Sequence, residues 1–427
     1  MGRARHLLRA WAVRDFRRLL AVRLLGQFGD GVFQASLAGA VLFDPQRQAA
    51  PADIAAGFAV VLLPYSILGP FAGVLLDRWS RQRLLVWVNV ARTAAVLVVA
   101  AALAAGLSGP AFYGSALVVV SLSRFVLSAL SAALPHVVDP AELVTANALA
   151  ATAGAAVAAA GGGTALAARA LAGDGNGGYA TIAAAAGVCY LLAAAVAIGL
   201  AFDRLGPSAA ERSGRETLPE VARGLAAGAR HVAGLPAVRN ALATIAAHRL
   251  GYGLWTVCTV LLFRNHFTAD GVFRTGLAGL SQVVVAVAVG GGLAALATPS
   301  AYRRIGPVRC PACALALAAV VEAGLVLPFR LPLQLPAALL LAFAAQAVKI
   351  SVDTVVQDGV EDAYRGRVFA LYDAVFNVAL VAAAGATAIF LPADGRSAAT
   401  VLLVGALFAA TALGYVTSSR RTRTAAR

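Results

Sequence analysis

Apolar segments of about 20 or more residues recur twelve times along this chain of 427 residues. A helix of about 20 residues spans the ~30 Å hydrocarbon core of a bilayer. Because lipid offers no hydrogen-bond partners, segments that cross it this way must pair their own backbone groups, as helices do. The sequence therefore predicts an all-α membrane protein with twelve transmembrane helices, near residues 19–43, 54–76, 84–106, 111–133, 144–171, 179–202, 239–263, 275–297, 308–328, 335–357, 368–391 and 398–418.

Composition agrees with that prediction and locates the charge. The chain is 60% hydrophobic and 13% charged, whereas a soluble domain carries about 25% charged residues. Most of its 35 basic residues fall in the N-terminal arm, the C-terminal tail and alternate loops, as the positive-inside rule describes. We therefore expect a multi-pass protein of a bacterial inner (plasma) membrane with both termini in the cytoplasm. The net charge of +15 then reflects topology, and no nucleic-acid partner is expected.

The longest polar interval divides the predicted helices into two sets of six. The loop at Val138–Ala141 (VDPA) is echoed by the loop at Val360–Ala363 (VEDA), which indicates an internal duplication. We expect two pseudo-symmetric six-helix bundles, residues 1–203 and 238–427 with a short cytoplasmic tail, joined by a cytoplasmic linker at 204–237. In transporters built from repeats, substrate binds between the halves near the midplane. Within the linker, 220–231 has a helical pattern with one apolar stripe and is expected to lie along the cytoplasmic face.

The first apolar segment carries four polar residues on one helical face: Arg23, Gln27, Asp30 and Gln34. Charge at membrane depth costs roughly 2.5–3.5 kcal/mol per residue even on insertion scales, so such residues face a partner or water. The stripe predicts the wall of a solute path. Asp30 lies near the middle of this helix and is our first candidate for proton coupling or substrate contact. The alternative is a structural hydrogen bond from Asp30 to Arg23 or to another helix.

Two arginines inside other spans are further candidates for this path. Arg124 shares a helical face with Ser121 and Ser128 and, since it stays protonated, would act on a carboxylate or bind an anion. A packing ion pair is the alternative for Arg124. Arg92, with Asn89 one turn away, is a weaker candidate.

The tenth segment carries a second charged group. Lys349 and Asp353 are four residues apart and can pair with each other, while Asp373 is expected at a similar depth on the next helix. These three residues are interpreted as a gate or latch, with a purely structural pair as the alternative. Glu322, near the outer end of the ninth segment, is expected to snorkel toward the outer surface.

Aromatic and small residues dominate the expected midplane. Phe33, Tyr65, Tyr252 and Trp255 are the candidates for lining a cavity there. An apolar cavity with few polar groups suits amphipathic solutes, whereas a sugar would require many more polar side chains.

The sequence of one predicted loop resembles a motif of a known family. Gly73, Asp77, Arg78, Arg81 and Arg83 fit the GxxxDRxxRxR pattern of the loop between helices 2 and 3 in the major facilitator superfamily. The resemblance implies that family's twelve-helix fold. It also implies that Gly73, Asp77, Arg78 and Arg81 form a latch at the cytoplasmic ends of the helices.

Two stretches further resemble the drug–proton antiporter and siderophore-exporter branch of that superfamily. They are Gln27–Asp30 (QFGD) and Leu134–Asn147. The glycine–proline pair of the antiporter motif in helix 5 is absent. Gly154 and the run of glycines at 161–163 stand in its place and permit tight packing against a neighbouring helix.

The leading function is therefore a secondary active transporter: a proton-coupled exporter (antiporter) of a small amphipathic or hydrophobic compound, working by alternating access. Export of an anionic or lipid-like solute, such as a siderophore or lysophospholipid, is the alternative. A non-transporting membrane sensor or enzyme is a remote one. No GxxxxGK[ST] motif is present, and Cys310 and Cys313 lack a second pair. We expect no cofactor and no metal, with the small-molecule substrate, protons and the lipid bilayer as partners of a monomer.

Overall fold

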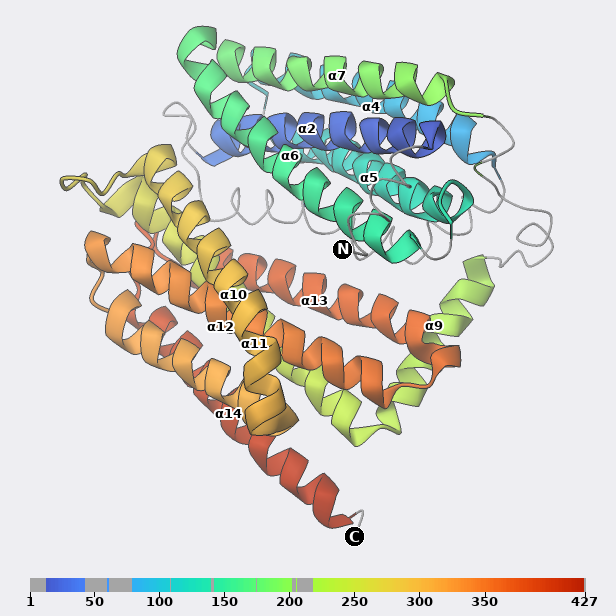
Figure 1. Cartoon of the computed structure of the whole chain (residues 1–427). Coiled ribbons are helices and arrows are strands. Elements are labelled where there is room, and N and C mark those ends of the chain that lie inside the picture. Colours follow the sequence, from blue (N-terminus) through green and yellow to red (C-terminus); the bar gives the residue numbers. More distant parts are fainter. Residues whose placement is uncertain are drawn as a thin grey trace. The chain divides into compact units, whose positions relative to one another are not determined.

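The computed structural model describes residues 13–42, 60, 79–107, 109–139, 142–173, 175–201, 205 and 218–425. In these ranges the regular structure is helical apart from one isolated bridge between Asp270 and Phe273. The described helices form two compact units (Figure 1), with the change from one to the other between Val221 and Ala222.

The described residues of the first unit form five long helices and one short one. α2 packs against α6 and α7, and α4 packs against α5 and α7. The helices are α2 (Arg14–Leu42), α4 (Arg81–Ala104), α5 (Pro110–Ala133), the 3₁₀ turn η1 (Leu134–His136), α6 (Leu143–Ala172) and α7 (Asn176–Ile198).

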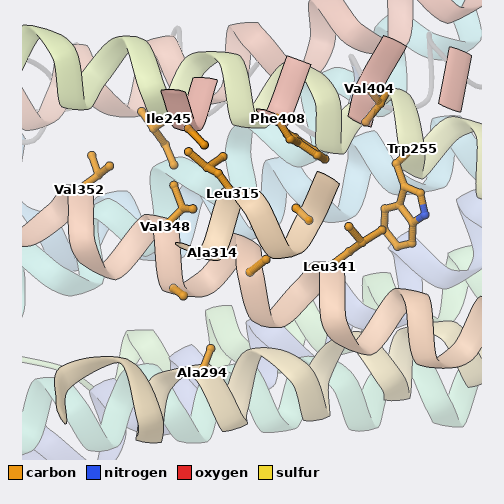
Figure 2. Packing of buried hydrophobic residues seen from close by; sticks show 14 of the residues in the cluster. Ile245, Trp255, Ala294, Ala314, Leu315, Leu341, Val348, Val352, Val404 and Phe408 are labelled. Carbon is orange, nitrogen blue, oxygen red and sulfur yellow. The ribbon is translucent and has the colours of Figure 1, made fainter. Parts of the chain in front are cut away.

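Among the described residues, the larger of the two apolar cores lies in the second unit. Trp255, Leu315, Leu341 and Phe408 from four different helices meet in it (Figure 2). Its elements are most of α9 (Leu218–Ala233), α10 (Pro236–Leu261) with the π-helix η2 (Leu262–His266), α11 (Gly276–Val321) with the π-helix η3 (Glu322–Val326), α12 (Leu331–Gly359), α13 (Asp362–Phe390) and α14 (Ala398–Ala425).

The helical prediction is confirmed where the structure describes the chain. Nine described helices are long and apolar enough to cross a membrane. The one at Gly276–Val326 covers two predicted spans, and α2 supplies the first predicted span, so eleven of the twelve are helical. The remaining prediction, 54–76, lies outside the described residues.

The element α11 covers two predicted spans, and it bends sharply at one residue between them. Gly306 has φ 85° and ψ 172° and is followed by Pro307. A left-handed φ suits glycine, and proline fits the first turn of a new helix because it needs no amide partner there. α11 is therefore two helices joined end to end, and the segments predicted at 275–297 and 308–328 are both present.

The predicted linker 204–237 contains a helix, α9, over the amphipathic stretch. In α9, His231 stacks on Tyr364 of α13 with ring centroids 4.2 Å apart. Gly224 and Gly228 of α9 pack against Arg367 of α13. These contacts attach the end of α9 to the beginning of α13. The placement of the linker along the cytoplasmic face stays a prediction.

Glycines bring α2 and α6 into close contact. A side chain at Gly31 would collide with the carbonyl of Ala158, and one at Gly161 would collide with the carbonyl of Phe28. Gly154 leaves room for the side chain of Gln27. The expected tight packing of these α6 glycines against a neighbour is thus present, and the neighbour is α2.

Gly161→Ala is expected to destabilise the first unit, because its new Cβ would overlap the backbone of α2. Overpacking of this kind costs about 1–3 kcal/mol. Gly163→Ala is the matched control, since no atom lies within 4 Å of the Cβ it would add. Thermal unfolding of both variants in detergent checks this prediction. Equal melting temperatures for the two would show that α2 and α6 are not in close contact at Gly161.

Candidate functional site

The carboxylate of Asp30 accepts hydrogen bonds from three other helices. Its Oδ1 lies 2.5 Å from Nη2 of Arg92 on α4, 2.7 Å from Oγ of Ser123 on α5 and 3.1 Å from the hydroxyl of Tyr190 on α7. Asp30 is 9% exposed and Arg92 is 1% exposed. Four helices of the first unit therefore meet at one buried ion pair.

Small residues that precede Asp30 on α2 make room for these partners. Gly29 faces the ring of Tyr190, with which any larger side chain would overlap. Gly26 faces Nη1 of Arg92, 3.3 Å from where a Cβ would lie. The two glycines of the sequence GQFGD thus leave space near Asp30 for the large side chains of Arg92 and Tyr190.

Arg92 is itself held by a further layer of contacts. Its Nη1 donates to Oδ1 of Asn89 at 2.8 Å, and its Cζ lies 3.7 Å from the centre of the Tyr190 ring. Asn89 in turn donates to the carbonyl of Leu85 at 2.7 Å. We refer to Asp30, Asn89, Arg92, Ser123 and Tyr190 as the Asp30 cluster.

The Asp30 cluster has the chemistry of a buried ion pair with supporting hydrogen bonds. An ion pair away from water survives only with good geometry and additional hydrogen bonds, which Ser123 and Tyr190 provide here. A proton added to Asp30 would cancel its charge and weaken its attraction to Arg92. If Asp30 loses its charge, the guanidinium group of Arg92 stays buried without a counter-charge, which is costly. Loss of either charge would therefore favour a rearrangement around the other residue.

The structure brings together only part of the predicted stripe on α2. Arg23 donates from Nε to Oε1 of Gln27 at 3.3 Å. The ionic partner of Asp30 is Arg92 and not Arg23. Gln34, further along the stripe, is half-buried. Arg124 follows Ser123 directly and interacts electrostatically with Asp30.

Two members of the cluster, Ser123 and Tyr190, did not emerge from the sequence. The hydroxyl of Tyr190 lies in the middle of a span that is otherwise alanine-rich, which is the signal that a donor is needed at that depth. Ser123 lies beside Arg124 but on a different helical face from the serines that we grouped with that arginine.

The aromatic candidates differ in their surroundings. Phe33 is 1% exposed and Trp255 is 4% exposed, so both are packed within their units. Tyr252 lies beside Trp255, with ring centroids 5.1 Å apart. Tyr65 lies outside the described residues. The role of these side chains in lining a cavity stays a prediction.

The second unit brings the predicted charged group together. Lys349 Nζ lies 2.6 Å from Oδ2 of Asp353, and Asp373 interacts electrostatically with both residues. Lys349 also lies 5.6 Å from the centre of the Tyr372 ring. The side chains of the pair are 34% and 25% exposed. In contrast to the Asp30 cluster, this group has access to the surface of its unit, and its role as a gate stays a prediction.

Two residues of the resembled loop motif, Arg81 and Arg83, lie in the described part of the chain. Arg81 is 2% exposed, and its Nη1 donates to the carbonyls of Ala132 at 2.9 Å and Leu205 at 3.2 Å. Arginine suits this place because the last carbonyls of a helix lack partners. Arg81 thus ties the beginning of α4 to the end of α5. Gly73, Asp77 and Arg78 lie outside the described residues.

The expectation that Glu322 snorkels outward is wrong. Glu322 is 1% exposed, and its Oε1 has no hydrogen-bond partner among the described residues. It begins η3, which packs against α12 and α14. Its Cβ lies 3.5 Å from the position of a Cβ at Gly405 of α14. The missing side chain at Gly405 lets α14 cover the carboxyl group.

Comparison with known proteins places this geometry in a family. The model of the Major Facilitator Superfamily matches residues 23–385. Two uncharacterized MFS-type transporters, from Mycobacterium bovis and Mycobacterium tuberculosis, are each 40% identical over 417 residues, which is 95% of this chain and 92% of each relative.

Solved structures share the fold at low sequence identity. The nucleoside transporter NupG matches with a TM-score of 0.71 at 14% identity, over 94% of this chain and 99% of that protein. The POT family transporter PepTSo matches with a TM-score of 0.69 at 12% identity, over 96% and 98% of the two chains. These likenesses confirm the predicted fold class.

Arg92→Met is expected to destabilise the protein strongly, because it leaves the charge of Asp30 buried and unpaired. Breaking a buried pair in this way costs about 3–5 kcal/mol. The double variant Asp30→Asn with Arg92→Met should recover part of that loss, since no charge is left behind. Arg23→Met is the control, because it removes an arginine from α2 that is half-buried and donates to Gln27 instead of pairing with Asp30. Thermal unfolding of the four proteins is the measurement, and a double variant no more stable than Arg92→Met alone would contradict the pairing.

Proposed function

The chain belongs to the major facilitator superfamily, and from that premise we propose that it is a proton-coupled exporter of a small amphipathic or hydrophobic compound. It is a multi-pass membrane protein and a secondary transporter, not an enzyme. Residues 1–203 and 238–427 are proposed to alternate access to a site between them. The proposed orientation has both termini in the cytoplasm of a bacterial cell.

The observation that carries proton coupling is the buried ion pair of Asp30 and Arg92. A coupling site needs a carboxylate that changes charge and a structural element that responds to the change. Asp30 on α2 is the carboxylate, and Arg92 places the responding charge on α4. Proton uptake by Asp30 weakens the contact between α2 and α4, and proton release restores it.

The proposed substrate class follows from the scarcity of polar side chains in the spans. The nine described helices that could cross a membrane each contain an 18-residue stretch with no more than two charged side chains. A path of small and aromatic residues binds apolar bodies with few polar anchors. The outward direction is supported by the resemblance of Gln27–Asp30 and Leu134–Asn147 to the antiporter branch.

Export of an anionic solute is the second candidate, and one observation favours it. Arg92 and Arg124 both act on the single carboxylate of Asp30. The cluster taken together with Arg124 therefore carries a net positive charge while Asp30 is ionised, and this charge increases when Asp30 takes up a proton. A siderophore or lysophospholipid carries the negative groups that such a charge attracts.

An inward proton gradient is expected to drive uphill exchange in vesicles that contain the purified protein. The probes are a cationic amphipathic dye and an anionic amphiphile, applied separately, and preference for the anionic probe would select the second candidate. Asp30→Asn should abolish the response to the gradient while exchange without a gradient persists, because the amide has the size of the carboxylate but cannot change its charge. The melting temperature of this variant reports the cost of leaving Arg92 without its counter-charge. Glu322→Gln is the control for a buried carboxyl outside the cluster. Wild-type exchange that ignores the gradient would end the proposal of proton coupling.

Asp353→Asn is expected to change the turnover of exchange but not its dependence on the proton gradient. Partly exposed pairs of this spacing contribute about 0.3–0.5 kcal/mol, so the melting temperature should stay close to that of the wild type. The rate of dye exchange, measured with and without the gradient, separates the two effects. An unchanged rate would remove Lys349 and Asp353 from the proposed gate.

A further inference from the structure

A basic cavity lies at the sharp bend of α11, away from the Asp30 cluster. It has a volume of about 410 Å³ and lies between this bend and the last turns of α14. A cavity of this size accommodates a small ligand or the headgroup of a larger one. Its lining consists of Arg303, Arg304, Ile305, Gly306, Pro307, Val308, Arg309, Val416 and Ser419.

The arginines of this cavity have no ion-pair partner among the described residues. Arg303, Arg304 and Arg309 are exposed, and none of them makes an ion pair or side-chain hydrogen bond with another described residue. No acidic residue is among the described residues that line the cavity. Asp358, at the end of α12, interacts with neighbouring Tyr302. Three guanidinium groups around one cavity form a site for an anion.

The backbone at the bend adds to this preference. The helix restarts after Gly306, so the first amide groups that follow Pro307 have no partners within the helix. These groups carry the partial positive charge of a helix N-terminus, which favours anions. The hydroxyl of Tyr415 donates to the carbonyl of Pro307 at 3.3 Å, which holds α14 against the bend. The cavity is therefore bordered by α14 as well as by the bend.

We propose that this cavity binds a phosphate group, with the phosphate of an anionic lipid headgroup and free inorganic phosphate as its two possible sources. Planar guanidinium groups recognise phosphate oxygens in pairs. The bend connects two predicted membrane helices, and in that topology the cavity lies at the depth of the lipid headgroups. Basic pockets between membrane helices at this depth are suited to anionic headgroups.

The test uses the purified full-length protein in detergent micelles. Phosphatidylglycerol, phosphatidylcholine and inorganic phosphate are each titrated, while native mass spectrometry and the melting temperature report binding. Saturable stabilisation by phosphatidylglycerol alone identifies a lipid site, and saturable stabilisation by inorganic phosphate identifies a free-phosphate site. Equal effects of phosphatidylcholine and phosphatidylglycerol, with none from phosphate, would overturn the proposal.

Arg304→Gln with Arg309→Gln should weaken binding about 25-fold, because a basic residue near an anionic headgroup contributes about 1 kcal/mol, or about fivefold. Arg14→Gln with Arg17→Gln removes the same charge from exposed positions on α2 and should leave binding within about twofold. An equal loss in both double variants would show attraction to any basic surface and would overturn the site.

Ser419→Trp separates the cavity from its charge. The indole would fill the space beside Val416 and keep all three arginines, so binding should be lost at unchanged net charge. Its melting temperature without ligand shows whether the variant is folded. A folded Ser419→Trp protein that binds phosphatidylglycerol or phosphate like the wild type would contradict a site in this cavity.

Discussion

The ion pair of Asp30 and Arg92 is the interaction on which the first unit depends. It joins α2 to α4, and the hydroxyl groups of Ser123 and Tyr190 extend it to α5 and α7. In an apolar protein interior a carboxylate without such partners is unstable. The same contacts make the cluster sensitive to one proton, because every one of them involves Oδ1 of Asp30. Stability and the proposed coupling thus reside in the same atoms.

The two units handle charge in different ways. In the first unit a buried pair is enclosed by four helices, whereas in the second unit Lys349 and Asp353 pair at a partly exposed position. The second unit instead buries single polar groups, such as Glu322, in its apolar core. A pair that can reach the surface of its unit is able to exchange partners, which a gate requires. A fully enclosed pair such as Asp30 and Arg92 cannot exchange partners at the surface of its unit, so it rearranges when one of the two residues loses its charge.

Hydropathy was sufficient to predict the helices and the fold class, because the length and apolarity of a membrane helix are local properties. The pairing of Lys349 with Asp353 was predictable for the same reason, since it depends on spacing along one helix. The partner of Asp30 was not, because Arg92 lies 62 residues away and the rotations of α2 and α4 depend on packing. Glycines that hydropathy ignores set that packing, as Gly29 does for Tyr190 and Gly405 does for Glu322. The arginine-lined cavity depends on the bend at Gly306, which spacing alone does not fix.

Infrared difference spectroscopy of the purified protein through a downward pH step tests the central claim most directly. The band of a protonated carboxyl group should appear in the wild type on acidification and should persist in Glu322→Gln. It should be absent in Asp30→Asn, which lacks the titrating group. A band of the same position and size in Asp30→Asn would show that another carboxylate takes up the proton, and would contradict the account of Asp30 as the coupling residue.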